Sequence, residues 1–399
     1  MARSADRVRR QERAALQKIQ GKKKTGVGRD YYDYNLLAAV ILLTCFGLVM
    51  LYSTSAYEAA VNYNGNDAFY FNKQAVISIG SFVLLLVFSQ FDYHFYARFA
   101  PYIYGISIVL LVATKFVGRT VNGARRWIYI GPISFQPAEL AKLAVILFLP
   151  CLIVKMGNKM QERKASLTVL GFGALASFCT YVFTENLSTA VIIAGITVLM
   201  IFIVHPKTAP FLWMFLGGAV LIGLVVFVIA GTVSSSSDSF RLRRIMVWLD
   251  PEAHASEGGY QVMQALYAIG SGGFFGKGLG NSTQKLGAVP EAQNDMIFSI
   301  ICEELGIFGA GIVMLLFIFL LYRLFFIARN APDLLGSLIA TGIFIHIALQ
   351  VVLNIAVVIN LIPTTGITLP FVSYGGTSIL FLMAEMTLAL SISKRIEFR

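Results

Sequence analysis

The chain has 399 residues, of which 57% are hydrophobic and only 13% are charged, and its mean hydropathy is +0.72. These values exclude a soluble globular protein. The formal net charge of +11 does not predict nucleic-acid binding, because no folded nucleic-acid module accompanies it. A membrane surface with anionic lipid is the partner that such a charge suits better.

The chain begins with a basic tail, and the Lys and Arg residues among its first 30 positions are Arg3, Arg7, Arg9, Arg10, Arg13, Lys18, Lys22, Lys23, Lys24 and Arg29. This charge density predicts a cytoplasmic tail at 1–32 without stable structure. The apolar run after it is too long for the core of a signal peptide, and other runs follow. Cleavage of the tail is therefore not expected.

About ten apolar runs follow, each long enough to cross a hydrocarbon core of roughly 30 Å. They lie at about 35–53, 74–91, 98–116, 137–156, 167–184, 189–204, 210–231, 296–321, 335–357 and 373–392. Only helices or closed barrels satisfy the backbone in lipid, and these runs lack the short alternating pattern of barrel strands. The predicted fold class is all-α, a polytopic integral membrane domain at 33–393. An even number of spans returns the C-terminus, 394–399, to the cytoplasm.

Three connecting segments are too long to be simple turns, and all three face the outside in this topology: 117–136, 232–295 and 358–372. The large outer loop at 232–295, between spans 7 and 8, is too long to lack structure of its own. In it, Phe240–Leu249 mixes basic and apolar residues like an interfacial helix. Tyr260–Gly270 is apolar but too short to span, so it reads as interfacial or re-entrant. Any chemistry is therefore expected at the outer face.

Metal sites and disulfides are not predicted. The histidines lie far apart without ligand spacing, at His94, His205, His254 and His346. The cysteines all fall within predicted spans, as small buried hydrophobes do; they are Cys45, Cys151, Cys179 and Cys302.

The glycine run Gly270–Gly280 superficially suggests a phosphate-binding loop. It fails that pattern because Ser271 stands at the first glycine position and Gly278 at the required Ser or Thr, and it follows no strand. Two interpretations stay open. The run is a flexible outer loop, or its backbone N–H groups act with Lys277 or Lys285 on a diphosphate.

The strongest candidate for chemistry is Asp295, where the large polar loop ends and an apolar run begins. A carboxylate at the mouth of a membrane helix could deprotonate a hydroxyl on a lipid-borne substrate. The alternative is an N-cap, a position that Asp prefers. The presence of Glu291, Lys285, Arg243 and Arg244 in the same loop favours the catalytic interpretation.

A second polar group begins the fourth span. Glu139 and Lys142 stand three residues apart, on one helix face. Ionisable residues within a membrane are functional candidates by default, although a mutual ion pair would also explain them. Before them come Arg125, Arg126 and Trp127. Guanidinium groups suit a diphosphate and an aromatic ring suits a sugar face, whereas lipid-headgroup anchoring is the alternative.

Three further acids fall within predicted spans: Glu303, Glu304 and Glu385. Glu303 is expected two helical turns below Asp295, on its side of the helix. A proton-coupled transporter would use such acids, which keeps a lipid-linked precursor flippase or other transporter open as a second function. A transporter should also show inverted halves with broken helices, and the sequence has no repeat of that kind. A non-catalytic scaffold is a third class.

At these residues the chain resembles the SEDS family (shape, elongation, division and sporulation), to which FtsW, RodA and SpoVE belong, and it is most like FtsW. The resemblance covers nearly the whole chain after the tail. The matching segments, in order, are Asn122–Trp127, Phe135–Lys142, Gly259–Gln261, Gly276–Gly280, Gln284–Lys285, Pro290–Asp295, Glu303–Gly306, Asn354–Ile355 and Pro363–Gly376.

The resemblance implies a peptidoglycan glycosyltransferase that polymerises lipid II at the outer face of the bacterial cytoplasmic membrane. Asp295 matches the family's essential acid, and Glu139 and Lys142 match an acid and a base of its central cavity. An inverting displacement of undecaprenyl diphosphate needs one general base, here Asp295. The residues expected at the substrate are Arg125, Arg126, Trp127, Arg243, Lys277, Lys285, Glu291 and Ser373.

The resemblance also implies the other components. No nucleotide is needed, because the substrate carries its own diphosphate; a divalent cation, Mg or Mn, could help to neutralise it, although no metal ligand is assigned. The implied partners are a class B penicillin-binding protein and division-complex proteins. Thr368 favours the division or sporulation branch over a RodA-like elongation polymerase, the alternative within the family. Glu185–Thr189 departs from the family's usual Gln-Pro-Asp-Leu-Gly-Thr.

Overall fold

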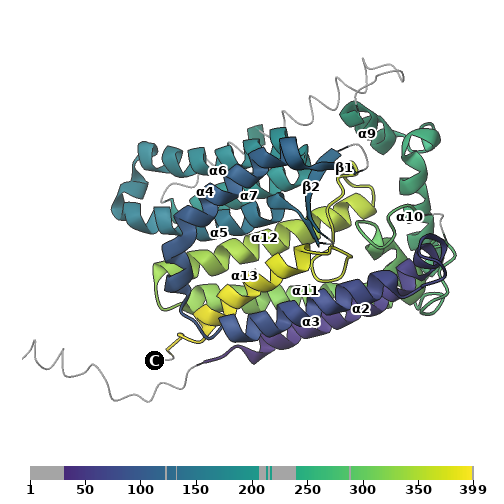
Figure 1. Cartoon of the computed structure of the whole chain (residues 1–399), viewed down its shortest axis with the longest axis horizontal. Helices are drawn as coiled ribbons and strands as arrows, with labels where there is room; N and C mark the ends of the chain where they lie inside the picture. Colours follow the sequence, from purple (N-terminus) through teal and green to yellow (C-terminus); the bar gives the residue numbers. More distant parts are fainter. Residues whose placement is uncertain are drawn as a thin grey trace, which may run out of the picture.

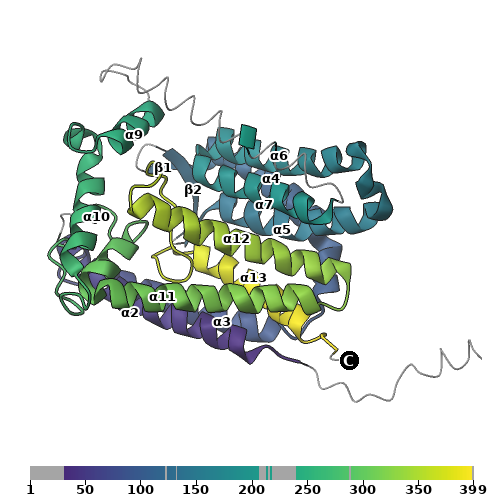
Figure 2. The same ribbon diagram turned by 180° about the vertical axis from the view of Figure 1, so that it is seen from behind.

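The computed structural model describes residues 31–121, 124–131, 133–205, 213, 216–217, 240–286 and 289–397. Long helices lie side by side and form a bundle (Figure 1). A small sheet and two shorter helices gather at one end of the bundle, and the C-terminus lies at the other end (Figure 2). We refer to these ends as the loop face and the terminal face.

The helices follow the predicted spans closely in position, though several are longer than predicted. Their bounds are α2 (Tyr34–Asn62), α3 (Phe69–Phe88), α4 (Tyr93–Val117), α5 (Pro137–Met156), α6 (Arg163–Thr184), α7 (Leu187–Val204), α9 (Phe240–Leu249), α10 (Gly259–Gly272), α11 (Ile297–Asn330), α12 (Leu334–Val358) and α13 (Ser378–Ser393). In the described part of the chain, eight helices are long and apolar enough to cross a membrane, and α13 is a shorter apolar helix. The predicted span at 210–231 lies almost wholly outside the described residues.

Side-chain caps explain where several helices begin. Asp33 accepts a hydrogen bond from the backbone N–H of Leu36 at the start of α2. Asn186 and Asp333 do the same for α7 and α12. The first N–H groups of a helix have no partner within the helix, so these caps satisfy donors that would otherwise be exposed to lipid headgroups or protein. The sequence therefore marks the helix starts with polar residues at the ends of apolar runs.

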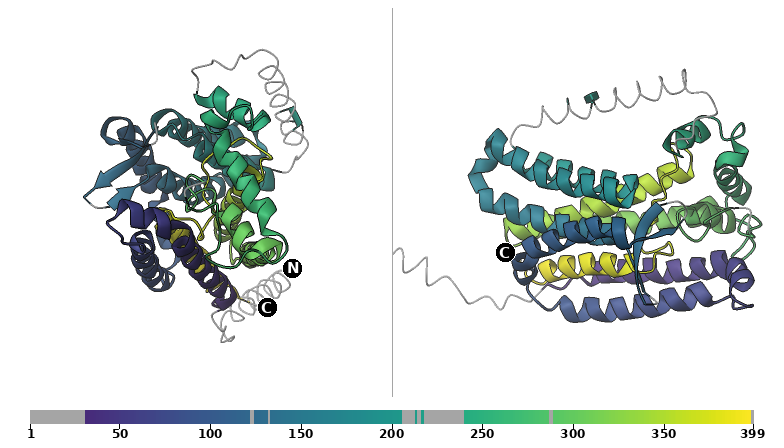
Figure 3. Two further views of the ribbon diagram at one scale, coloured as in Figure 1. Left: turned by 90° about the vertical axis from the view of Figure 1, so that its right-hand side faces the viewer. Right: turned by 45° about the horizontal axis from the view of Figure 1, so that its top comes forward.

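The centre of the bundle is formed by α5, α12 and α13, which carry the most completely buried faces. Helices α2 and α3 pack against α11 and α13, and α4, α6 and α7 pack around α5 (Figure 3). The outer helices leave apolar side chains exposed; on α3 they include Val76, Ile79, Val83 and Val87. Such a surface suits lipid rather than water. The chain is a multi-pass membrane protein.

Helix α11 is interrupted near the loop face by Gly306, whose φ is +69°. The loop after α10 fills the gap: the backbone N–H groups of Lys277 and Gly278 donate to the carbonyls of Glu303 and Glu304, both at 2.9 Å. Only glycine takes such a backbone conformation readily. The glycine run 270–280 therefore allows its backbone to approach the backbone of α11 closely. No nucleotide-type loop is formed there.

The predicted all-α membrane fold class is confirmed, and a small three-stranded antiparallel sheet is added to it at the loop face. Its strands are β1 (Arg119–Val121), β2 (Ala124–Ile130) and β3 (Ile133–Phe135), in the order β1-β2-β3. The signal was present in the sequence, because Trp127–Ile130 is rich in aromatic and β-branched residues. The sheet lies at the loop face, where hairpin backbones are not obliged to be helical as they would be in lipid.

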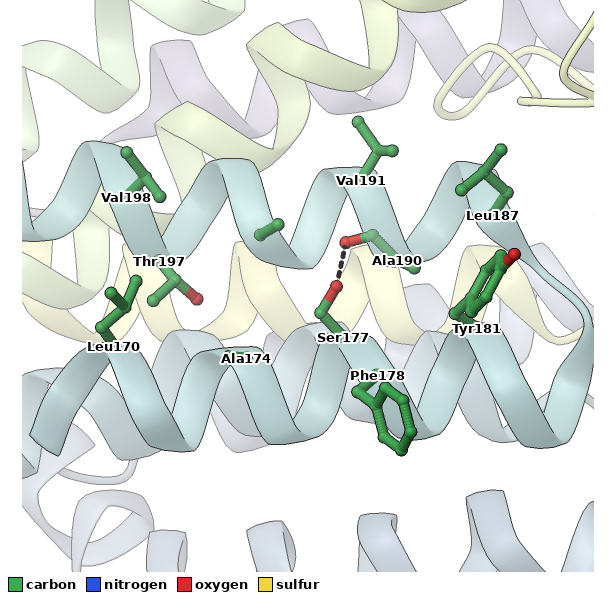
Figure 4. Close-up of a pocket in the computed structure, with 11 residues that line it drawn as sticks. Leu170, Ala174, Ser177, Phe178, Tyr181, Leu187, Ala190, Val191, Thr197 and Val198 are labelled. Atoms are coloured by element: carbon green, nitrogen blue, oxygen red, sulfur yellow. Dashed lines mark hydrogen bonds between the residues drawn. The ribbon is translucent and has the colours of Figure 1, made fainter. Parts of the chain in front are cut away.

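An apolar groove of about 420 Å³ lies between α6 and α7 (Figure 4). The hydroxyl groups of Ser177 and Thr197 within it are bound to backbone carbonyls of Ala190 and Ile193, at 2.7 and 2.8 Å. The described side chains that line the groove are therefore almost wholly apolar, and none of them is charged.

Candidate active site

Asp295 lies at the loop face, in the turn that leads into α11. It does not cap the helix: the N-cap position belongs to Met296, and no side chain there accepts a cap hydrogen bond. Its Oδ1 atom is buried and has no hydrogen-bond partner among the described residues. The N-cap interpretation of Asp295 is therefore wrong, and its carboxylate remains available for another purpose.

The backbone of Asp295 is held by a different helix. Asn354 of α12, which is fully buried, donates from Nδ2 to the carbonyl of Asp295 at 2.9 Å and to the carbonyl of Ile367 at 2.6 Å. A single side-chain amide thus joins the end of the large loop to the segment 359–377. Within that segment Gly366, at φ +73°, lies so close that a Cβ there would be 3.8 Å from Oδ2 of Asp295.

Two guanidinium groups from distant parts of the chain act on the charge of Asp295. Arg126 comes from β2 and donates to the carbonyl of Glu185 at 3.3 Å, and its Nε is buried without a partner among the described residues. Arg244 comes from α9 and donates to the carbonyl of Thr364 at 3.0 Å. Both side chains are partly covered, so their charges are less screened than on an open surface.

These surroundings set the protonation of the site. Burial, together with the neighbouring carboxylate of Glu291, raises the pKa of Asp295 to about 7, although Arg244 and Arg126 oppose the rise. Burial lowers the pKa of Arg126 and of Arg244, and for Arg244 the charge of Arg126 lowers it further. A carboxylate with a pKa near neutrality suits a general base, and two guanidiniums held close together suit a polyanion.

Glu139 and Lys142 form the predicted ion pair, at 2.9 Å, with both side chains buried. Each member of the pair also makes a hydrogen bond to a neighbouring helix. Lys142 donates to Oε1 of Gln350 at 3.2 Å, and Glu139 accepts from the hydroxyl of Ser378 at 3.0 Å. Gln350 in turn donates to the carbonyl of Thr368 at 3.0 Å. The pair therefore lies beneath the same segment, 359–377, that touches Asp295.

The structure does not gather all of the predicted substrate residues around Asp295. Arg125 points back toward α4, where it donates to the carbonyl of Lys115 at 3.1 Å. Trp127 shares the face of β2 with Arg125 rather than with Arg126, because side chains alternate along a strand. Ser373 is buried and accepts from the backbone N–H of Leu369 at 2.8 Å. Arg243 lies in α9, but its side chain is outside the described part of the structure.

Lys277 and Lys285 belong to a separate cluster. Lys277 pairs with Glu303 at 2.6 Å, and Lys285 pairs with Glu304 at 2.8 Å. Thr283 and Ser282 also donate to Glu303, and Ser53 of α2 donates to Glu304. The expected alignment of Glu303 with Asp295 along one helix is therefore wrong, because α11 begins after Asp295 and Glu303 is used by the glycine-rich loop. The third intramembrane acid, Glu385, is paired with His346 at 2.8 Å.

Several residues of the site were not singled out from the sequence. Arg244 is a loop cation whose charge acts on Asp295, whereas the sequence had named Arg243 as the substrate-binding residue of this pair; the side chain of Arg243 is not among the described ones. Asn354 appeared only within a family motif. Buried oxygens without partners among the described residues recur here, on Asp295, Asn354, Thr365 and Gln293. Since buried polar atoms are normally satisfied, their concentration indicates a place for a polar ligand. No group of three or more metal-type ligands occurs in the described part of the chain.

The fold and the site together define a polytopic membrane enzyme with a carboxylate and two guanidiniums at one membrane face. The family model described as "Cell cycle protein", which covers FtsW, RodA and SpoVE, matches residues 33–397. The chain belongs to this FtsW/RodA/SpoVE family, as the resemblance predicted, and it is a glycosyltransferase.

Individual relatives agree with this assignment. Stage V sporulation protein E of Bacillus subtilis is 40% identical over 366 residues, covering 91% of this chain and 97% of that protein. The probable peptidoglycan glycosyltransferase FtsW of the same organism is 36% identical, with 92% of both chains covered. Among solved structures, a chain of a peptidoglycan synthase complex that coordinates polymerization and crosslinking has a TM-score of 0.73 at 27% identity, covering 91% of this chain and 97% of that chain. RodA of Thermus thermophilus has a TM-score of 0.65 at 25% identity, with 92% and 98% covered.

Proposed function

We propose that the protein is a peptidoglycan glycosyltransferase that polymerises lipid II at the outer face of the bacterial cytoplasmic membrane, with Asp295 as general base. The observation that carries the proposal is the environment of Asp295: a half-buried carboxylate with a free oxygen and a pKa near 7, beside two guanidiniums. The names of the relatives support the substrate class.

The reaction is a single displacement. Asp295 accepts the proton of an acceptor-sugar hydroxyl while that oxygen forms a bond to the anomeric carbon of the donor. The bond from this carbon to the diphosphate oxygen breaks, and its electron pair leaves with undecaprenyl diphosphate. Arg126 and Arg244 stabilise the charge that develops on the leaving group. No carboxylic acid is required to protonate the diphosphate, unlike the two-carboxylate arrangement of most glycosidases.

Glu139 and Lys142 then have a supporting part, under the segment 359–377. Lys142 contributes positive charge below the site, and the buried ion pair with Glu139 fixes its position. Arg125, Trp127, Arg243 and Ser373 stay candidates for contacts with other parts of the substrate. Lys277 and Lys285 are better explained as stabilising the loop through Glu303 and Glu304.

A divalent cation, Mg or Mn, is an additional component of the proposal. The free oxygens of Asp295, Asn354 and Thr365 are hard donors of the kind that these ions bind. When bound, such an ion would supply further positive charge for the diphosphate. No nucleotide is proposed, because the donor carries its own leaving group.

The cellular setting completes the proposal. From the basic tail and the short basic loops we infer that both termini are cytoplasmic and that the loop face is on the outer side. We propose a role in cell division, with a class B penicillin-binding protein and division-complex proteins as partners. RodA-like elongation is the alternative within the family. A lipid-linked precursor flippase is the alternative in another class, but each of the three acids that suggested it is paired with a base.

The test is polymerisation of lipid II by the purified full-length protein, with and without the transpeptidase partner. Asp295→Asn keeps the size of the side chain but cannot accept the proton, so we expect a loss of about 10²–10⁴ in rate with normal membrane insertion. Glycan synthesis by Asp295→Asn at the wild-type rate would refute the assignment of the base. Transport of lipid II across vesicles without polymer would favour the flippase.

A further inference from the structure

A group of aromatic rings lies at the loop face, on the α2 and α3 side. This aromatic cluster consists of Tyr63, Phe69, Tyr70 and Tyr374. The rings of Tyr63 and Phe69 are stacked, with centroids 3.6 Å apart and planes at 12°. Tyr70 stands edge-on to Tyr63 at 5.7 Å and to Tyr374 at 5.2 Å. The Tyr63 side is open, since this residue is 38% exposed.

A carboxylate and an amide lie at the inner side of these rings. Glu58 of α2 accepts from the hydroxyl of Tyr70 at 3.3 Å through Oε1, and from Nε2 of Gln293 at 2.8 Å through Oε2. Gln293 is only 4% exposed, yet its Oε1 has no hydrogen-bond partner among the described residues. A buried acceptor without a partner is costly, so this amide oxygen is available to a donor that none of the described residues provides.

The aromatic cluster is continuous with the catalytic site. Gln293 precedes Asp295 by two residues in the same turn, and its carbonyl accepts from the backbone N–H of Tyr374 at 2.9 Å. The guanidiniums reach Asp295 from other elements, β2 and α9. The recorded contacts of the aromatic cluster include a carboxylate and an amide but no Lys or Arg. The site is therefore polarised, with cations in one part and aromatic and acceptor groups in another.

We propose that the aromatic cluster, with Glu58 and Gln293, binds the uncharged acceptor sugar whose hydroxyl is presented to Asp295. Aromatic faces suit the apolar C–H face of a pyranose, and a few fixed polar groups orient the hydroxyl and acetamido groups. The diphosphate is recognised separately by Arg126 and Arg244. This assignment deepens the proposed function and rests on it for the identity of the reaction.

Anchoring at the membrane interface is the competing explanation, because tyrosine rings are common there. It would account for exposed rings. It would not account for a buried glutamine whose amide nitrogen binds a carboxylate while its amide oxygen has no partner among the described residues. Anchoring also predicts no affinity for a soluble sugar. The two explanations therefore differ in a direct binding measurement.

The probe is a lipid-free tetramer of N-acetylglucosamine, titrated onto the full-length protein in lipid nanodiscs. We expect saturable binding by the wild type and about tenfold weaker binding by Tyr63→Ala, equal to the loss of one aromatic contact. Tyr63→Phe should bind like the wild type. Tyr57→Ala is the matched control, since Tyr57 is 49% exposed on the same helix and has no recorded contact with the aromatic cluster.

Glu58→Gln provides a second test that keeps the side-chain size, and we expect weaker binding because two hydrogen bonds to a carboxylate change. Asp295→Asn should still bind the tetramer, so a failure of the general-base assignment would leave this proposal standing. Absence of saturable binding by the wild type would overturn it. Wild-type affinity in both Tyr63→Ala and Glu58→Gln would overturn it equally and would favour interfacial anchoring.

Discussion

Asn354 holds the backbone of Asp295: its amide donates at 2.9 Å to the carbonyl of the aspartate, from a helix that begins 39 residues after Asp295 in the chain. The same amide binds Ile367 at 2.6 Å. The proposed base is thus positioned by α12 and by the segment 359–377, rather than by the helix that it precedes. The reactivity of Asp295 should therefore depend on Asn354, which we do not expect to contact the substrate.

The first prediction concerns this positioning. Asn354→Leu removes both donated hydrogen bonds, and we expect turnover in the lipid II assay to fall about 10²-fold, the effect of a misplacement near 1 Å. The Michaelis constant should change much less. Asn330→Leu is the control, because Asn330 donates only to a carbonyl of its own helix at the terminal face. Equal losses in the two variants would mean that Asn354 has only a general structural role.

The second prediction is a pH profile. Since the pKa of Asp295 is about 7, the base is protonated below that pH, and kcat/KM should fall tenfold for each pH unit below it. Glu291→Gln removes a carboxylate that raises the pKa of Asp295, so the fall in kcat/KM on the acid side of the profile should move to lower pH. Arg244→Met removes a cation that lowers the pKa of Asp295, so the same fall in kcat/KM should move to higher pH. Shifts in the same direction for the two variants would contradict the electrostatic account.

The third prediction separates structure from chemistry at Glu139 and Lys142. Lys142→Met leaves a buried carboxylate unpaired and should lower the free energy of unfolding by about 3–5 kcal/mol if the site is dry. Glu139→Leu combined with Lys142→Met removes both charges and should restore most of this stability. Polymerase activity should not return with it. Recovery of activity in the double variant, or in the charge swap Glu139→Lys with Lys142→Glu, would reduce the pair to a structural role.

The fourth prediction concerns the glycine-rich loop. A Cβ at Gly276 would lie 2.2 Å from the carbonyl oxygen of Glu304, whereas one at Gly280 meets nothing within 4 Å. Both glycines have positive φ, +78° and +83°. Gly280→Ala should therefore cost only about 1 kcal/mol of stability from backbone strain, and Gly276→Ala about 3 kcal/mol or more because backbone must also move. Denaturant unfolding in micelles measures both, and similar values would disprove the close approach.

The sequence predicted the helices well, because apolar length is a local signal and lipid leaves few alternatives. It also predicted the ion pair of Glu139 and Lys142, while the role of Asp295 stays a prediction. It could not predict that Lys277 and Lys285 are neutralised by Glu303 and Glu304, since this depends on the loop folding back onto α11. Nor could it predict that Arg244 acts on the charge of Asp295, since this depends on the placement of α9, which is fixed in part by Trp248 donating to the carbonyl of Asn360 at 3.0 Å. That contact joins positions far apart in the chain.

The last prediction concerns the side of the membrane on which the loop face lies, and it rests on charge bias. The large loop carries several cations, although the positive-inside rule predicts few on the outer side. Long loops cross the membrane largely regardless of their charge, so the short basic loops should determine the orientation. Ser282 is a poor labelling position because it is buried and donates to Glu303. Ala253 at the loop face and Gln161 at the terminal face are both exposed, so we choose Ala253→Cys and Gln161→Cys.

A membrane-impermeant thiol reagent added to intact spheroplasts should label Ala253→Cys and leave Gln161→Cys unlabelled until the membrane is opened. The unmodified chain gives the background, because its cysteines lie within α2, α5, α6 and α11. The reverse pattern would place Asp295, Arg126 and Arg244 in the cytoplasm. A polymerase of the outer face could not then use them, and the proposed function would fail with its topology.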